Sequence, residues 1–169
     1  LQAITEVLQR GRQVLVLIPE IALTPQTLAR FRNRFGAAVA LHSQIGDTER
    51  MRVWLRCRDG LEPLLIGTRS AILTPFRNLG LIIVDEEHDP SFKQGDGLRY
   101  SARDLAVKRA RDLNIPLLLG SATPALETLH NARSGRYKLS SMVTRPGGAE
   151  LPKMRILDIR GVRLTEGLS

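Results

Sequence analysis

The sequence has a single cysteine, few aromatic side chains and no long apolar run. Cys57 by itself excludes an intrachain disulfide and a cysteine-cluster zinc site within the chain, and such cysteine usage favours a reducing compartment. No stretch approaches the roughly 20 apolar residues that cross a bilayer, and residues 1–10 lack the basic start and apolar core of a signal peptide. We therefore expect a cytoplasmic protein without a membrane partner, in which Cys57 fills space on a helix.

Acidic residues are outnumbered by basic ones. The 169 residues, a length that fits one α/β domain, include 25 Lys plus Arg against 17 Asp plus Glu, so the formal net charge is +8. This balance favours a polyanionic partner, because guanidinium groups bind phosphate bidentately and release counterions. A basic surface that only aids solubility is the alternative.

Short apolar runs alternate with helical patterns along the chain. The runs are rich in Val, Ile and Leu on both alternating faces, as strands of a buried parallel sheet are, and cover residues 14–18, 38–41, 64–66, 79–84 and 115–119. Helices are predicted over residues 1–9, from Thr24 as N-cap, over residues 47–58 with Met51, Trp54 and Leu55 buried, from Ser101, and from Thr123. This order predicts an α/β fold with a doubly wound, mostly parallel sheet and helices on both faces.

Ligands bind such a sheet beyond the carboxyl ends of its strands. The run over residues 79–84 ends in Asp85-Glu86-Glu87-His88. Here Asp85 can hold Mg²⁺ through water, and Glu86 can orient or deprotonate the water that attacks a γ-phosphate. Acidic residues at a strand end are also common turn residues and helix caps, so their spacing alone leaves both interpretations open.

Hydroxyl and basic residues follow three other strands. Gly120-Ser121-Ala122-Thr123-Pro124 follows the last run, and we expect Ser121 to lie on a strand tip next to that of Asp85. Thr24 begins a helix after the first run, where the helix N-terminus can meet a phosphate. Gly67 permits close backbone approach, and Thr68 and Arg69 after it can hold the next phosphate. Helix capping and a solvated surface arginine are the simpler alternatives.

The segment over residues 89–104 combines aromatic and basic side chains. Phe92 and Tyr100 lie here beside Lys93, Arg99 and Arg103. Aromatic rings stack on unpaired bases while neighbouring cations bind the backbone, which is the usual chemistry of single-strand binding. Burial of the two rings in the core is the alternative.

Taken in order, these segments resemble motifs Ia, Ib, II and III of superfamily 2 helicases, and Asp-Glu-Glu-His with residues 89–104 is similar to the PriA family of replication-restart helicases. The resemblance implies a RecA-like P-loop NTPase lobe of an ATP- and Mg²⁺-dependent 3′-to-5′ DNA helicase that acts at stalled or branched forks. It also implies that His88 relays the nucleotide state to Ser121 and Thr123, and that residues 89–104 couple DNA contact to ATP hydrolysis. Implied partners are single-stranded and forked DNA, primosome proteins and single-strand-binding protein; zinc is implied only outside these residues.

Two features depart from that family's pattern. No Gly-x-x-x-x-Gly-Lys-Ser/Thr loop is present, and Leu98 stands where we expect tryptophan. We therefore expect a piece of a longer protein, with residues 1–160 as a first motor lobe without its Walker A loop and residues 161–169 as a linker to a second lobe. By itself this piece should be nearly inactive as an ATPase.

Two other functions stay open from the sequence. One is another superfamily 2 enzyme, either a RecG-like helicase or an RNA-directed DEAH protein. The other is a basic nucleic-acid-binding module with a degenerate motor fold. On the helicase interpretation the candidate catalytic residues are Asp85, Glu86, His88, Ser121 and Thr123, and the candidate DNA contacts are Thr24, Thr68, Arg69, Phe92, Lys93, Arg99 and Tyr100.

Overall fold

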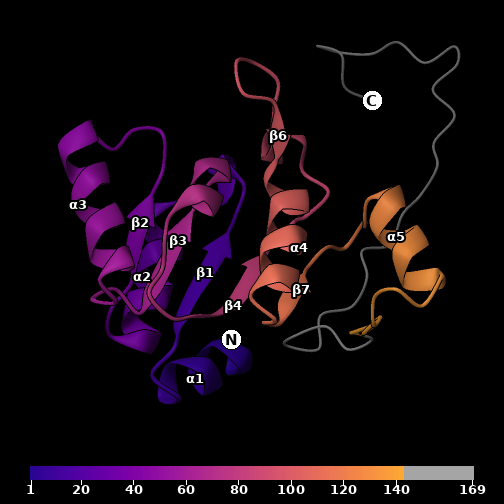
Figure 1. The fold of residues 1–169 in the computed structure, drawn as a ribbon, viewed down its shortest axis with the longest axis horizontal. Helices are drawn as coiled ribbons and strands as arrows, with labels where there is room; N and C mark the ends of the chain where they lie inside the picture. The colour runs from indigo at the N-terminus through magenta and orange to yellow at the C-terminus, as the bar shows by residue number, and fades with distance from the viewer. Residues whose placement is uncertain (143–169) are drawn as a thin grey trace, which may run out of the picture.

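Five parallel strands form the centre of the computed structural model, which describes residues 1–142 (Figure 1). Their order across the sheet is β2-β3-β1-β4-β7, and every neighbouring pair is parallel. The strands are β1 (Gln13–Leu17), β2 (Val39–Leu41), β3 (Leu64–Gly67), β4 (Leu79–Val84) and β7 (Leu117–Leu119). All five runs predicted from the sequence are therefore strands.

Helices cover both faces of the sheet. One core cluster joins α1 (Gln2–Gln9) and α2 (Pro25–Phe35) to the sheet, and the other joins α3 (Asp47–Arg58) and α4 (Ala102–Asp112) to the opposite face. Within β1, Val14 and Val16 belong to the first cluster, whereas Leu15 and Leu17 belong to the second. Since alternate side chains of one strand enter two different cores, the predicted doubly wound sheet is confirmed.

Two helices begin at the caps that the sequence predicts. The Thr24 hydroxyl accepts a hydrogen bond from the backbone N–H of Thr27 at 3.2 Å, and Pro25 occupies the first turn of α2. The Ser101 hydroxyl accepts one from the N–H of Asp104, also at 3.2 Å, and so caps α4. Both helices therefore start directly beyond segments that carry candidate site residues.

Two predictions about helices are wrong. In α3 the buried side chains are Val53 and Cys57, and Leu55 is half-buried. Met51 is 59% and Trp54 38% exposed, because the helix packs along the i,i+4 stripe through Val53. Within residues 1–142 the last helix is α5 (Leu126–Arg133), which begins after Ala125 rather than at Thr123.

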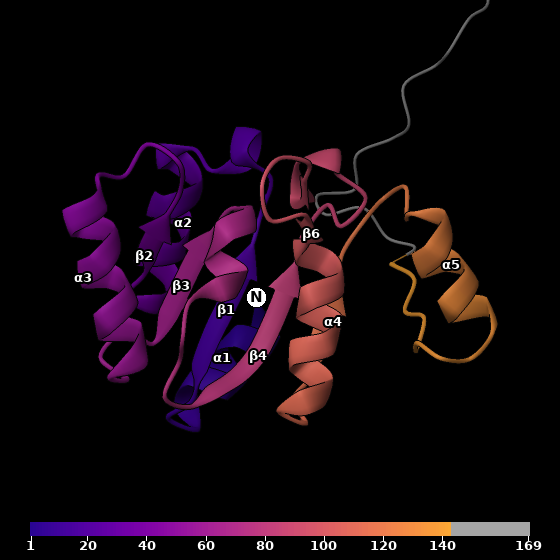
Figure 2. The same ribbon diagram turned by 45° about the horizontal axis from the view of Figure 1, so that its top comes forward.

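A small hairpin rises at the carboxyl end of the parallel strands (Figures 1 and 2). It consists of β5 (Lys93–Gln94) and β6 (Tyr100–Ser101), which pair antiparallel. Three short 3₁₀ helices complete the described chain: η1 (Glu20–Ala22), η2 (Arg69–Leu73) and η3 (Pro90–Phe92). Within residues 1–142, no helix has the length and apolarity to cross a membrane. From the sequence we also predict a short strand near residues 154–159. That segment and the linker expected over residues 161–169 lie outside the described residues.

Candidate functional site

The tips of β4 and β7 meet at one edge of the sheet. Val84 lies opposite Leu119 in the strand pairing, and the N–H of Gly120 donates to the carbonyl of Val84 at 2.8 Å. The N–H of Glu87 in turn donates to the carbonyl of Gly120 at 3.0 Å. The expectation that the acidic segment and the hydroxyl turn share a strand edge is thus confirmed.

Asp85 fits closely against the turn after β7. A Cβ atom added to Gly120 would lie 3.1 Å from Asp85 Oδ1, so glycine leaves room for this carboxylate. The Asp85 N–H donates to the carbonyl of Leu17 at 2.9 Å, which ties the tip to β1 as well. Asp85 is exposed to solvent. The backbone is therefore fixed on both sides while the carboxylate faces outward.

Glu86 adopts an unusual backbone conformation. Its φ of 49° lies in the left-handed region, which costs a non-glycine residue about 1 kcal/mol or more. The neighbouring hydrogen bonds of Asp85 and Glu87 hold it there. The result is that Glu86 and Asp85 are both exposed, whereas Glu87 is only 2% exposed.

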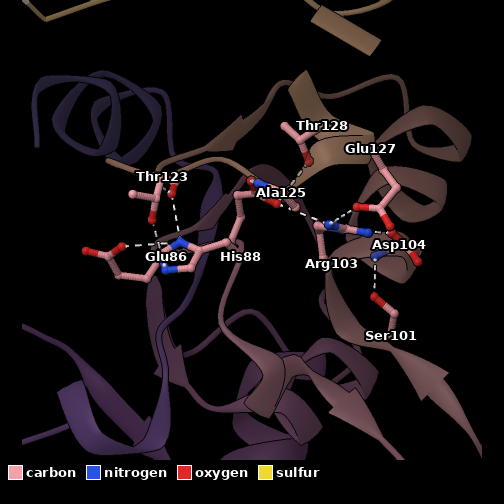
Figure 3. Close-up of polar contacts among 11 residues, drawn as sticks. Glu86, His88, Ser101, Arg103, Asp104, Thr123, Ala125, Glu127 and Thr128 are labelled. Atoms are coloured by element: carbon pink, nitrogen blue, oxygen red, sulfur yellow. Dashed lines mark hydrogen bonds and ion pairs between the residues drawn. The ribbon is translucent and has the colours of Figure 1, made fainter. Parts of the chain in front are cut away.

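His88 joins the acidic segment to the hydroxyl turn (Figure 3). Its Nδ1 lies 2.7 Å from Ser121 Oγ and its Nε2 lies 3.3 Å from Thr123 Oγ1. Glu86 Oε2 lies 3.6 Å from the same Nδ1. The five candidate catalytic residues therefore form one continuous group, and the Thr123 hydroxyl contacts His88 instead of capping α5.

The exposed acids suit a hard cation. Residues 1–142 contain no group of three or more His, Cys, Asp and Glu side chains arranged around a metal position. Mg²⁺ does not need such a cage, because it keeps several waters and takes one or two carboxylates plus ligand phosphates. The Asp85 carboxylate, exposed beside a glycine that leaves it space, fits that requirement.

The sequence did not reveal that the Glu87 side chain holds neighbouring segments of the fold together. Its Oε1 accepts from the N–H of Ala125 at 2.8 Å, and its Oε2 accepts from the Thr128 hydroxyl at 2.9 Å. Arg103 Nη1 lies 3.3 Å from the same Oε2. The sequence shows a third acid after an apolar strand and an arginine near the start of the next predicted helix, but no local pattern pairs the two.

Thr68, Arg69 and Tyr100 line a common polar pocket of about 150 Å³. Thr68 is 8% exposed, and Arg69 Nη1 donates to the carbonyls of Ser91 and Lys93 at 3.2 and 2.9 Å. Arg69 therefore also supports the base of the hairpin. Thr24 is not among the residues that line this pocket, so the structure does not bring it to the other candidates there.

The aromatic segment differs from the prediction in one residue. Phe92 is 2% exposed and belongs to the core cluster beneath α3 and α4, so its predicted stacking on an unpaired base is wrong. Burial in the core is favourable because it removes the apolar surface of the ring from water, and the polar residues around it in the loop cannot shield it. Lys93 and Arg99 are exposed, and Tyr100 is half-buried. Leu98, in the loop between the hairpin strands, is 76% exposed.

Comparison with known proteins supports a family assignment. The DEAD/DEAH box helicase family matches residues 1–132. The chain is 49% identical over 170 residues to the replication restart protein PriA of Haemophilus influenzae, covering 100% of this chain and 23% of that protein. It is 44% identical over 161 residues to PriA of Bacillus subtilis, covering 95% of this chain and 20% of that protein. The chain thus spans less than a quarter of the length of these relatives.

Solved structures agree on the fold. Helicase Lhr of Mycobacterium smegmatis, bound to ssDNA and AMP-PNP, is similar at a TM-score of 0.50 and 18% identity, over 70% of this chain and 16% of that one. The helicase MrfA bound to DNA is similar at a TM-score of 0.50 and 13% sequence identity, and the match covers 77% of this chain and 19% of that one. The predicted RecA-like α/β fold is confirmed. With the family match over residues 1–132 and the likeness along its whole length, the chain belongs to the DEAD/DEAH box helicase family and is similar throughout to the replication restart protein PriA.

Proposed function

We propose that residues 1–160 are part of the first motor lobe of an ATP-dependent DNA helicase that acts in replication restart. The observation that carries this proposal is the contact of His88 with both Ser121 and Thr123, which links the acids after β4 to the turn after β7. A motor needs such a link, because the state of the nucleotide must reach other parts of the lobe. Residues 161–169 would lead toward a second lobe.

In the hydrolytic step the chain supplies two acids, Asp85 and Glu86, and one histidine, His88, that connects them to the turn after β7. Asp85 would hold Mg²⁺ through water, and the bound ion would neutralise charge on the phosphates. Glu86 orients the attacking water or accepts its proton, for which its exposed carboxylate is suited. His88 then passes the change at this tip to Ser121 and Thr123.

The nucleic-acid side of the proposal uses the hairpin end of the sheet. Lys93 and Arg99 are exposed cations on the hairpin, and Tyr100 lines the polar pocket with Thr68 and Arg69. These groups suit a phosphodiester backbone with unpaired bases. Thr24 stays a candidate phosphate contact at the N-terminus of α2.

Several finer properties come from the likeness to PriA. These are the 3′-to-5′ direction, the preference for stalled or branched forks, and the contacts with primosome proteins and single-strand-binding protein. Zinc would belong to parts of the protein outside this chain. The sequence contains no Walker A loop, so we propose that these residues by themselves hydrolyse ATP poorly.

Glu86→Gln in the full-length protein tests the proposal. The substitution keeps the shape of the side chain but removes the base, so DNA-stimulated ATP hydrolysis should fall at least about 100-fold while ATP binding persists. Glu49→Gln, which changes an exposed acid in the first turn of α3, is the matched control and should leave the rate unchanged.

The same assays separate the other functions. Wild-type hydrolysis that Glu86→Gln does not reduce would contradict the assigned role. A protein that binds DNA but hydrolyses no ATP would favour a nucleic-acid-binding module without turnover. Unwinding of RNA forks in preference to DNA forks would favour an RNA-directed enzyme.

A further inference from the structure

A nearly buried ion pair connects the acidic segment to α4. The side chains of Glu87 and Arg103 are 1% and 11% exposed, and Arg103 Nη1 lies 3.3 Å from Glu87 Oε2. Removing two charges from water is costly, and apolar side chains of similar volume often stabilise a fold as well or better. The pair therefore calls for an explanation other than stability.

Glu87 and Arg103, which we name the clamp, contact three parts of the chain at once. Figure 3 shows Arg103 beside Asp104 and Glu127. The Glu87 carboxylate accepts hydrogen bonds from the N–H of Ala125 and the hydroxyl of Thr128, at the start of α5. The Arg103 guanidinium also lies 3.0 Å from Asp104 and 3.7 Å from Glu127. One cation thus lies among three carboxylates, on α4, on α5 and after β4.

The position of the clamp in the chain connects it to two segments, the candidate catalytic residues and the β5–β6 hairpin. Glu87 lies between Glu86 and His88, so any shift of its backbone moves both candidate catalytic residues. Arg103 is in the first turn of α4, and Ser101, the cap of that helix, is the last residue of hairpin strand β6. A displacement of the hairpin therefore reaches Arg103 through two residues of chain.

We infer that Glu87 and Arg103 are positioning residues that transmit a displacement of the β5–β6 hairpin to the hydrolytic tip. The inference rests on the proposed function. Both clamp side chains are nearly buried, so we assign them no contact with a nucleotide. The clamp sets how the turn after β7 and the start of α5 lie against the acidic segment, and hence how His88 meets Ser121 and Thr123. Nucleic acid bound at the hairpin acts on the hydrolytic residues through this ion pair.

The test uses Glu87→Gln in the full-length protein, with a single-stranded oligonucleotide as the probe. Glutamine keeps the side-chain volume but loses the charge that faces Arg103. We expect the ratio of DNA-stimulated to basal ATP hydrolysis to fall about tenfold. A purely structural role would lower the amount of active protein, which scales both rates equally and leaves the ratio unchanged.

Further variants sharpen the test. Arg103→Lys keeps the charge but loses the planar fork that reaches several carboxylates, and should give an intermediate ratio. The double variant Glu87→Gln/Arg103→Gln should have a ratio no lower than that of the more affected of its two single variants, Glu87→Gln and Arg103→Gln, because the two residues act through one contact. Asp112→Asn breaks the exposed Lys108–Asp112 pair on the same helix and should leave the ratio at the wild-type value.

The outcomes separate this inference from the proposed function. A wild-type protein without DNA-stimulated hydrolysis would overturn both. Wild-type stimulation with an unchanged ratio in Glu87→Gln would overturn the clamp alone. If both Glu87→Gln and Arg103→Lys fail to fold, as judged by circular dichroism, the pair is only a stabilising contact. That result would also overturn the clamp inference.

Discussion

Substituting Gly67 by alanine tests how tightly β3 ends against the candidate nucleic-acid pocket. A Cβ atom at this position would overlap the Cβ of Ala71 and lie 2.7 Å from the carbonyl oxygen of Leu41, closer than real Cβ contacts occur. Because one obstacle is backbone of a paired strand, the sheet edge must shift. Overpacking of this kind costs about 2 kcal/mol, which for a domain of this size lowers the melting temperature by about 6 °C.

Thermal unfolding followed by circular dichroism measures this cost. The control is Gly95→Ala, whose added Cβ meets nothing within 4 Å and which should melt with the wild type. In the double variant Gly67→Ala/Ala71→Gly one of the two overlaps disappears, so its cost should be about 1 kcal/mol less than the sum of the single costs. A wild-type melting temperature for Gly67→Ala, or strict additivity in the double variant, would refute the packing argument.

Two further predictions concern the acidic tip and the core. Gly120→Ala places a Cβ 3.1 Å from Asp85 Oδ1 and should raise the Mg²⁺ concentration for half-maximal ATP hydrolysis by about tenfold with little change in stability; an unchanged Mg²⁺ titration would contradict the assigned metal role. Burial, with a smaller contribution from the charge of Glu62, raises the pKa of the Cys57 thiol to about 12. Iodoacetamide at pH 8 should therefore modify Cys57 only after unfolding in urea, and rapid modification of the native protein, seen by mass spectrometry, would show that the thiol is accessible.

The arrangement of strands and helices followed from local patterns. The apolar run over residues 14–18 identified a strand between two helix layers, and all five residues of β1, including the polar Gln13, are buried. Thr24 and Ser101 were identified as caps because hydroxyl side chains satisfy the N–H groups of the next turn within a few residues. The meeting of Asp85 with the turn after β7 followed from the parallel sheet, in which strand ends share one edge.

The errors arose where a distant partner decided the conformation. Thr123 looked like a cap, but its hydroxyl contacts His88, which lies 35 residues earlier in the chain. Phe92 lies in a polar segment, yet its ring is in the core. Glu87 was assigned no role from the sequence, because its partner Arg103 is 16 residues away on α4. No local pattern contains that information.

A Mn²⁺ position in the full-length protein tests the central claim most directly. Crystals grown with Mn²⁺ and a non-hydrolysable ATP analogue would locate the metal by its anomalous scattering. We predict a peak beside the Asp85 carboxylate, at the edge where the turn containing Ser121 contacts His88. A metal and nucleotide bound elsewhere, with Asp85 and Glu86 facing only solvent, would contradict the assignment of this strand edge as the hydrolytic site.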